Sequence, residues 1–464
     1  MNKNKTKLDQ LTSLRFFAAF MIIIQHSKGL FGLQYSSEYL CQGVSFFFVL
    51  SGFILTYVYP NLNTWHEIKQ FWKARIARIT PAYFFIFLIT ISIISCDWDI
   101  KTAIAHLLMI QAWIPSSNFA LSYNPIAWSV STEFFFYLAF PFLIYKWNNT
   151  WFIKLIFSGI ILIALMLISN LYHLPNYKGP KMGFIISESM LIYINPLARI
   201  FEFIFGMSIA ILWKKTKTKQ TSSFLLATIY EITAIILCAA FLYNIHYISN
   251  WAKPILGTSV SRWLTYDSGV FIFGLLIYII AQGRGKISQI LCNPFLVLLG
   301  EISFSMYLIH FSILHFYKNN ISSFIELPGP ISFSIFVLIL AILSFLIWIC
   351  VEMPGRRFIL GYKSINFLKT LKDVWYNNIT PSHKFIFPGL FIICSTGLLQ
   401  SKIDITDSVD QIENVLPTNF DPLTYISLNP DLEKATENMT TIVKKIDWAK
   451  WHYLNHGKKE KRKY

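Results

Sequence analysis

Long apolar runs, separated by short loops rich in Lys and Arg, dominate the chain. A helix needs about 20 largely apolar residues to cross a bilayer. Runs that approach this length lie at about 12–31, 41–59, 81–96, 126–145, 151–171, 196–213, 222–245, 264–282, 291–315, 331–350 and 385–401. A shorter apolar stretch at 102–114 predicts a re-entrant or interfacial helix. The pattern therefore predicts an all-α polytopic membrane protein.

The composition supports this fold class. Hydrophobic residues make up 55% of the chain and charged residues only 14%, which is atypical of a soluble domain. The net charge of +16 is compatible with nucleic-acid binding in principle. The basic residues, however, lie mostly in alternate loops between apolar runs, which is how membrane topology is encoded. We therefore expect a lipid bilayer as partner, and no nucleic acid.

The loop charges also predict an orientation. Lys and Arg cluster near the N-terminus, at 69–78, at 214–219, at 284–286 and at 356–372, whereas the intervening loops carry only scattered cations. The positive-inside rule then places the N-terminus in the cytoplasm. An eleventh span would export residues 402–464, although the lysine-rich end of that tail argues mildly the other way.

The first apolar segment carries an arginine and a histidine on one face. Eleven residues separate Arg15 from His26, so a helix would place them about 16 Å apart along its axis, with azimuths about 20° apart. Ionisable side chains in a span are costly and suggest function. The alternative is an arginine that snorkels to the interface and a histidine bonded to a neighbouring helix.

Arg75 and Arg78, between the second and third runs, are three residues apart. On a helix they would present two guanidinium groups to one ligand. Together with Lys73 they suit a phosphate-bearing group that arrives from the cytoplasm. The alternative is plain positive-inside charge, which does not account for their arginine identity or shared face.

The fourth span opens with a polar stripe. Ser129, Glu133 and Tyr137 recur every four residues on an otherwise apolar helix that begins near Trp128. A carboxylate there must be protonated, paired, or open to a water-filled cavity. Structural pairing with an arginine of another helix is the alternative interpretation.

The ninth span carries a similar face. Gly300, Ser303, Tyr307 and His310 follow helical spacing. Gly300 and Ser303 are typical of helix packing in membranes, whereas Tyr307 and His310 are candidates for chemistry. Polar groups on several separate spans together predict a central polar cavity.

In this combination and order, the motifs closely resemble those of the acyltransferase-3 family of integral-membrane O-acyltransferases. The resemblance covers about residues 8–358. It rests on the Arg15 to His26 spacing, Ser51-Gly52 within the run 43–55, Arg75-x-x-Arg78 with Pro81, Trp128-Ser129-x-x-x-Glu133 with Tyr137, and Ser303-x-x-x-Tyr307-x-x-His310. It implies a core of about ten helices in a bacterial cytoplasmic (inner) membrane, and transfer of an acyl group, usually acetyl from acetyl-CoA, to a hydroxyl of a cell-envelope polysaccharide, lipopolysaccharide or exopolysaccharide.

Acyl transfer to an alcohol needs a base and stabilisation of an oxyanion. We assign the roles of the candidate residues from these two requirements. His26 suits the base, although a transient acyl carrier is also open, and Glu133 would orient it. Arg75 and Arg78 would hold the donor phosphates, with the pantetheine arm running from Arg15 towards His26. The substrate or the oxyanion would be contacted by Trp128, Ser129, Tyr307 and His310.

The C-terminal region predicts two further parts. Residues 359–401 would form a cytoplasmic linker and the eleventh transmembrane helix, and residues 402–464 a small, α-rich extracytoplasmic module. The runs 419–431 and 448–457 resemble a short module found at the ends of glycosyltransferases and polysaccharide proteins. Contact with glycan is one hypothesis for it; a helical appendage with interfacial Trp and Tyr residues is the other.

Three alternatives remain open from the sequence. A transporter would also place polar residues in its spans, a succinyl-type transferase of the same family would differ only in its acyl group, and another membrane acyltransferase fold with one essential histidine would share the chemistry. No His-Glu-x-x-His pair occurs, so we expect no metal. The oligomeric state is not encoded in these patterns.

Overall fold

Helices make up nearly all of the structure, a computed structural model that describes residues 7–31, 38–93, 99–175, 186–217, 223–321, 328–362 and 421–429. The chain divides into two compact units, Met1–Ser382 and His383–Tyr464. The first unit contains α1 (Asp9–His26), η1 (Glu38–Gln42), α2 (Gly43–Val58), α3 (Trp65–Ile93), α4 (Ile100–Leu107), η2 (Gln111–Trp113), α5 (Ser117–Ala120), α6 (Trp128–Ile144), α7 (Trp147–Leu171), η3 (Ser189–Ile194), α8 (Pro196–Lys217), α9 (Phe224–Tyr266), α10 (Val270–Ile280), α11 (Lys286–Leu291), α12 (Pro294–Phe316), η4 (Tyr317–Ile321), α13 (Gly329–Ile347), η5 (Trp348–Glu352) and α14 (Met353–Leu360).

Within the described part of the chain, seven helical segments are long and apolar enough to cross a membrane. They are Tyr39–Val58, Trp65–Ser92, Trp147–Leu171, Ser189–Lys217, Phe224–Ile280, Pro294–Asn320 and Gly329–Leu360. The 17-residue α6 is shorter, and α1 and α10 complete the bundle. The predicted all-α polytopic fold is therefore confirmed, while the count of ten core spans remains a prediction. The predicted eleventh span, at 385–401, lies outside the described residues.

The third helix is much longer than the predicted span at 81–96. Thr64 and Glu67 form a reciprocal capping box, in which the Thr64 hydroxyl accepts from the Glu67 N–H and the Glu67 carboxylate from the Thr64 N–H, at 3.2 and 3.0 Å. The helix α3 thus starts at Trp65 and continues through Pro81 to Ile93. The segment that carries Arg75 and Arg78, which the apolar pattern placed in a loop, is therefore helical.

The predicted spans at 222–245 and 264–282 are also corrected. The helical segment α9 runs from Phe224 to Tyr266 and consists of two helices joined at a kink at Gly257. The φ of Gly257, +88°, is unfavourable for other residues. The Ser249 hydroxyl lies 2.9 Å from that of Ser261 and 2.6 Å from that of Thr265. In a straight helix, residues 12 positions apart would be about 18 Å apart. The chain therefore folds back at Gly257, and α10 adds only 11 residues beyond it.

The stretch at 102–114, predicted as one re-entrant or interfacial helix, contains the short helix α4 and, after it, the separate turn η2. Asp99 caps α4 by accepting hydrogen bonds from the backbone and hydroxyl of Thr102, and these bonds lower the pKa of the Asp99 carboxyl. Ile104 and Leu107 of this eight-residue helix are exposed, whereas its polar His106 is buried. The apolar side chains thus face outward, as in an interfacial helix.

Close helix packing brings the pocket-forming elements together. A side chain on Gly52 of α2 would collide with the backbone of Phe203 on α8, and one on Gly300 of α12 would collide with the backbone of Thr12 on α1. Small residues allow membrane helices this close approach. The predicted packing role of Gly300 is confirmed.

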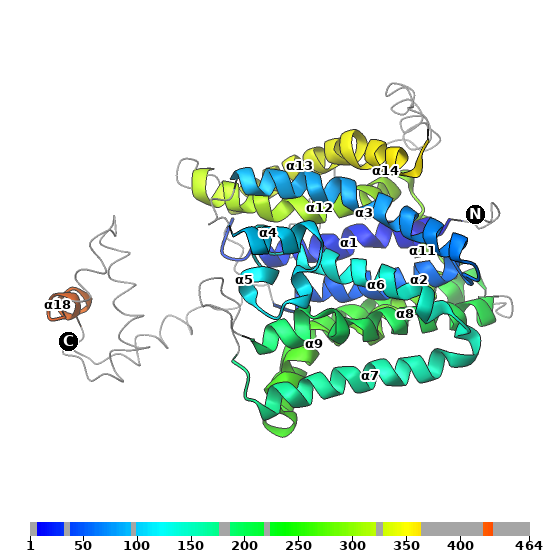
Figure 1. Ribbon diagram of the computed structural model, residues 1–464, viewed down its shortest axis with the longest axis horizontal. Helices are drawn as coiled ribbons and strands as arrows, with labels where there is room; N and C mark the ends of the chain where they lie inside the picture. Colours follow the sequence, from blue (N-terminus) through cyan, green and yellow to red (C-terminus); the bar gives the residue numbers. More distant parts are fainter. Residues whose placement is uncertain are drawn as a thin grey trace. The chain divides into compact units, whose positions relative to one another are not determined.

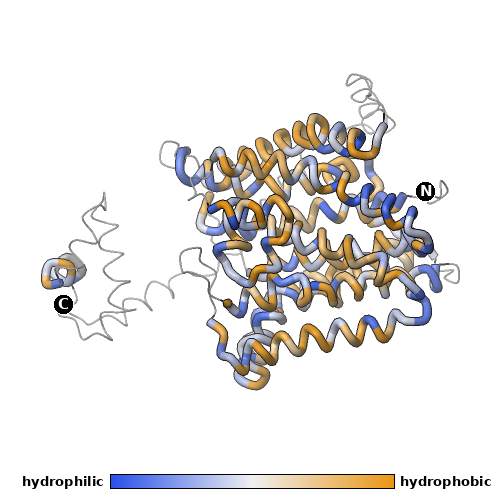
Figure 2. Tube along the Cα trace, in the orientation of Figure 1, coloured by the Kyte–Doolittle hydropathy of each residue, from blue (hydrophilic) through white to orange (hydrophobic). Residues whose placement is uncertain are grey.

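The two ends of the bundle differ in character. The N-terminus, α11 and α14 lie at one end, and α4 and α5 lie at the other (Figure 1). Hydrophilic residues gather towards the helix ends, while apolar residues cover their middles (Figure 2). Lys7 bonds to Glu301, and Arg284 donates to the carbonyl of Lys217, at 3.0 and 2.8 Å. Several basic segments that the topology prediction assigned to one side therefore meet at one end.

In the second unit, the structure describes only residues 421–429. Asp421 caps α18 (Pro422–Ser427) by accepting from the Thr424 N–H at 2.9 Å. The predicted module at 402–464 otherwise lies outside the described residues.

Candidate active site

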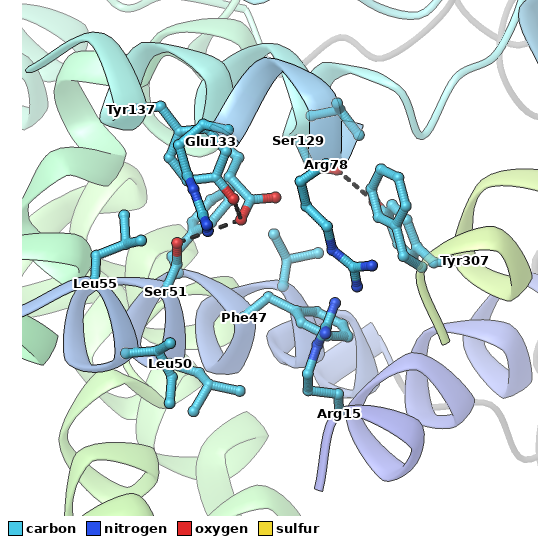
Figure 3. Close-up of a pocket in the computed structure, with 16 residues that line it drawn as sticks. Arg15, Phe47, Leu50, Ser51, Leu55, Arg78, Ser129, Glu133, Tyr137 and Tyr307 are labelled. Atoms are coloured by element: carbon cyan, nitrogen blue, oxygen red, sulfur yellow. Dashed lines mark hydrogen bonds between the residues drawn. The ribbon is translucent and has the colours of Figure 1, made fainter. Parts of the chain in front are cut away.

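A polar pocket opens between α1, α2, α3, α6 and α12. It is lined by predicted site residues from four of these helices, together with Ser51, Tyr137 and apolar side chains of α2 (Figure 3). The predicted site residues that line it are Arg15, Arg75, Arg78, Ser129, Glu133 and Tyr307. The cavity volume is about 140 Å³. The prediction that polar groups of separate spans share a cavity is confirmed for these six residues.

Three arginines concentrate positive charge in the pocket. The guanidinium groups of Arg15 and Arg78 point towards one another from α1 and α3 (Figure 3). Arg75 lies one helical turn before Arg78, and its guanidinium lies over the rings of Tyr59 and Tyr137, at 5.7 and 5.8 Å from the ring centres. Its buried Nε has no hydrogen-bond partner among the described residues. Lys73 is exposed and does not line the pocket.

Arg78 is already engaged by a carboxylate. It forms an ion pair and hydrogen bond with Glu352, whose other oxygen accepts from the Ser305 hydroxyl at 3.1 Å. Glu352 is only 1% exposed. Its position at the end of a π-helical turn, η5, aims its side chain at α3 and α12.

Glu133 forms the opposite wall of the pocket. One oxygen of its carboxylate accepts from the Tyr137 hydroxyl at 2.6 Å and from the Ser51 hydroxyl at 3.3 Å. Figure 3 shows these two bonds on the side of the pocket away from Tyr307. The expected contact between Glu133 and His26 does not form, because this carboxylate is held by its neighbours on α6 and α2.

Tyr307 and Ser129 close another side of the pocket. Their hydroxyls are hydrogen-bonded to one another at 2.7 Å, and both lie within hydrogen-bond distance of the backbone carbonyl of Ile126, at 3.1 and 3.0 Å. This shared carbonyl, just before the start of α6, fixes the tyrosine ring against the helix.

His26 and His310 form a separate pair behind this tyrosine. His26 Nδ1 lies 2.8 Å from His310 Nε2, and the rings of Tyr307 and His310 are 5.8 Å apart. Among the described residues, neither histidine lines the pocket itself. The structure therefore brings His26 and His310 together, next to the pocket but not within it.

Trp128 lies outside the pocket wall. Its ring packs on Tyr193 at 4.8 Å and on Phe48 at 6.5 Å. Phe48 also contacts Arg199, which is buried in an ion network with Asp267 and Glu202. Arg199 and Glu202 thus balance each other's charge in the interior rather than contribute to the pocket.

The sequence did not predict two contacts of the site, those between Arg78 and Glu352 and between Ser51 and Glu133. Glu352 was recognisable as a boundary charge, but its partner Arg78 is remote in sequence. Ser51 lies in a motif of the second run, yet nothing local indicates that it bonds to Glu133. In contrast, Thr64-x-x-Glu67 is a capping signature that could have placed the start of α3.

The site combines anion recognition with acid–base groups. Three guanidinium groups, balanced in part by Glu133 and Glu352, suit a ligand with more than one negative charge. The imidazole rings of His26 and His310 lie beside this pocket. Among the residues that the structure describes, no three His, Cys, Asp or Glu side chains are grouped to hold a metal ion.

The sequence matches a known family model over most of its length. The acyltransferase-3 model, described as an acyltransferase domain, matches residues 8–353. This range includes every pocket residue and both histidines. No solved structure matches the chain.

Several proteins are similar to this chain at low sequence identity. Acyltransferase MdmB of Streptomyces mycarofaciens is 26% identical over 339 residues, which cover 67% of this chain and 80% of the relative. A putative O-acetyltransferase of Staphylococcus aureus (strain COL) is 25% identical, with 66% and 50% covered. The O-acetyltransferase OatA of S. aureus is 24% identical, with 67% and 51% covered. The chain thus spans about half the length of these staphylococcal relatives.

Proposed function

This chain belongs to the acyltransferase-3 family and is a multi-pass membrane O-acyltransferase, and we propose that it moves an acetyl group from cytoplasmic acetyl-CoA to a hydroxyl of a cell-envelope glycan. The three arginines that line one pocket carry this proposal. The staphylococcal relatives are named as O-acetyltransferases, which supports acetyl as the acyl group.

The pocket suits the phosphate end of the donor. Coenzyme A carries a pyrophosphate and a 3′-phosphate, and guanidinium forks bind such groups with paired hydrogen bonds. Arg75 is the best placed, because it lines the pocket and its buried Nε lacks a partner among the described residues. The cavity of about 140 Å³ is small beside typical ligand pockets of ~300–1,000 Å³. It therefore suits one part of the donor, with the rest of the molecule along neighbouring surfaces.

The pantetheine arm would run along α1 towards His26. Arg15 lines the pocket, and His26 is the last residue of the same helix. Eleven residues of helix span about 16 Å. In Figure 1, α1 runs from the end of the bundle near α11 towards the end near α4 and α5. This path would carry the acyl group away from the basic end, which we assign to the cytoplasm by the positive-inside rule.

The proposed chemistry is direct acyl transfer. His26 takes the proton from the acceptor hydroxyl, whose oxygen forms a bond to the acyl carbonyl carbon. The carbon–sulfur bond then breaks, and the thiolate takes up the proton to leave CoA as the thiol. Tyr307 and Ser129 line the pocket, and the Tyr307 ring lies 5.8 Å from that of His310. The Tyr307 hydroxyl would turn from the Ile126 carbonyl to donate to the developing oxyanion.

Glu133 has a different role in this proposal from the one expected. Its carboxylate offsets part of the arginine charge and orients Tyr137 and Ser51. It would thus shape the donor pocket rather than orient the base.

The test is transfer by the purified full-length chain in proteoliposomes. Labelled acetyl-CoA is supplied on one side and glycan acceptors on the other, and the products are analysed by mass spectrometry. We expect an acetyl increment on the acceptor; a succinyl increment from succinyl-CoA alone would identify a succinyl-type transferase. Glycan or sugar counterflow without use of acyl-CoA would instead support the transporter alternative.

A further inference from the structure

The His26 and His310 rings meet edge to edge. Their planes are 15° apart, and the ring centres lie 5.1 Å from one another. The facing nitrogens are only 2.8 Å apart, much closer than the ring centres. Face-to-face stacking would not bring two nitrogens so near, so this is the geometry of an in-plane N–H···N hydrogen bond.

The backbone determines which nitrogen of His310 carries a proton. His310 Nδ1 lies 2.5 Å from the carbonyl oxygen of Tyr307, in the preceding turn of α12. A carbonyl oxygen can only accept, so His310 Nδ1 must be the donor. In a neutral imidazole the other nitrogen, Nε2, is then an acceptor. His310 Nε2 therefore needs a proton from its partner.

That requirement determines the form of His26. The proton in the bond between the two rings must be on His26 Nδ1, because His310 Nε2 accepts it. Neutral His26 then has its lone pair on Nε2. The two residues also differ in exposure, since His310 is fully buried while His26 is partly exposed.

We infer that His310 is a positioning residue that holds His26 in the tautomer with a free lone pair on Nε2, and that this nitrogen takes the acceptor's hydroxyl proton. The inference rests on the proposed role of His26 as base. It replaces the expected role of His310 as a residue that contacts the substrate or oxyanion.

The pair also stabilises the charged state of the base. When His26 Nε2 gains the hydroxyl proton, the ring becomes an imidazolium and its Nδ1–H a charged donor to His310 Nε2. Charge-assisted hydrogen bonds are roughly twice as strong as neutral ones. The chain of bonds ends at the Tyr307 carbonyl, so His310 supports the charge without losing its own Nδ1 proton. When the thiolate takes the proton from His26 Nε2, the original tautomer returns.

Two substitutions at one position separate positioning from packing. His310→Phe keeps a ring but removes the acceptor, so kcat should fall about 10- to 100-fold, by analogy with the loss of a partner that orients a metal-bound histidine. The KM for acetyl-CoA should change little, because the arginines are untouched. His310→Gln should restore most of kcat, since its amide oxygen can accept from His26 Nδ1–H and its NH₂ can donate.

His106 provides a matched control. It is also fully buried and bonds through Nε2 to a backbone carbonyl, that of Phe119, at 2.9 Å. Its ring packs among Phe87 and Tyr123, away from the pocket. His106→Phe should therefore leave kcat close to that of the unmodified chain. Equal losses in His106→Phe and His310→Phe, with no rescue by His310→Gln, would mean that His310 only packs.

A second measurement reads the tautomer without relying on activity. The full-length chain, labelled with ¹⁵N-histidine in lipid nanodiscs, is compared with its His26→Gln variant to assign the His26 nitrogens. We expect a protonated Nδ1 and an unprotonated Nε2, and loss of this preference in His310→Phe. A proton on Nε2 of neutral His26 in the unmodified chain would overturn the inference. Failure of the unmodified chain to use acetyl-CoA would contradict the proposed function instead, and the tautomer would still be measured.

Discussion

Arg78 and Glu352 form an ion pair across 274 positions of sequence. The Glu352 carboxylate is 1% exposed and also accepts a hydrogen bond from Ser305. One acidic side chain thereby connects α3, α12 and the end of η5 beside the pocket. It orients one of the three pocket arginines and offsets its charge.

Removal of either partner should destabilise the protein more than removal of both. Glu352→Met or Arg78→Met leaves an unpaired buried charge, which costs about 3–5 kcal/mol. The double variant leaves none, so its loss of unfolding free energy should be well below the sum of the single losses. Denaturant unfolding in detergent measures all three.

Two comparisons help to interpret the stabilities of these single and double variants. The Lys7–Glu301 pair is more exposed, so Lys7→Met should cost only about 0–1 kcal/mol. The Arg78→Met and Glu352→Met double variant should recover stability but not CoA binding, because Arg78 is also a proposed donor ligand. Strictly additive losses of stability would show that the pair has no coupling.

Arg75→Ala should weaken CoA binding with little loss of stability. Its Nε has no partner among the described residues, so no protein hydrogen bond at that atom is lost. A hydrogen bond to a charged group is worth about 1.5–3 kcal/mol, which is about 10- to 100-fold in affinity. Arg75→Lys should recover only part of this, because an ammonium lacks the fork.

Calorimetry with CoA and with dephospho-CoA would identify the phosphate that Arg75 binds. Lys73→Ala is the matched control, because it removes a positive charge from the same stretch of α3 outside the pocket. An Arg75→Ala variant that binds CoA no more weakly than Lys73→Ala would leave positive-inside topology as the explanation of these cations.

His26→Ala should abolish most transfer while leaving donor binding intact. Loss of a general base typically costs about 10²- to 10⁴-fold in rate, whereas the pocket arginines remain. Single-turnover transfer and CoA calorimetry on the same preparation separate the two effects. His246→Ala, at an exposed position of α9, is the control for loss of a histidine. Turnover equal to that of this control would remove His26 from the mechanism.

Local patterns predicted much of the fold. The apolar run at 41–59 became α2, because a continuous apolar run of that length has few stable states in a bilayer other than a helix. Residues three or four positions apart share one face of a helix, so spacing alone predicted that Arg75 lies on a common face with Arg78, and Ser129 with Glu133.

Contacts between distant segments were not predictable in the same way. The partner of Arg78 lies on another helix, and the site of Glu133 is set by Ser51 of α2. The gap at 246–263 between two predicted spans suggested a loop, yet it is helical except for the break at Gly257, and Ser249 bonds to Ser261 across that reversal. The pairing of His26 with His310 likewise depends on the packing of α1 against α12, which spacing within one helix does not encode.

Glu133→Gln should lower turnover more than stability. The amide keeps one oxygen that can accept from Tyr137 and Ser51, but it removes the negative charge that faces the three arginines. A pocket with less balanced charge should release CoA more slowly, so kcat should fall while CoA affinity rises. Stopped-flow release of CoA and thermal unfolding measure the two effects. A variant that accumulates poorly but keeps full activity per folded molecule would show that Glu133 is a structural partner only.

The last prediction concerns the side of the membrane on which the C-terminal region lies. An eleventh span at 385–401 would place residues 402–464 on the acceptor side, where a glycan-contacting module would raise the local concentration of polymer. Truncation after Ser401 should then spare acetyl transfer to a short acceptor but reduce modification of a long polymer. In a variant with its native cysteines replaced, Thr418→Cys should react with a membrane-impermeant thiol reagent in intact cells. Lys286→Cys, exposed at the first residue of α11, the helix at the basic end of the bundle (Figure 1), should react only after lysis. The opposite labelling at Thr418→Cys would put the tail in the cytoplasm, and equal loss of both acceptors on truncation would contradict a role in glycan contact.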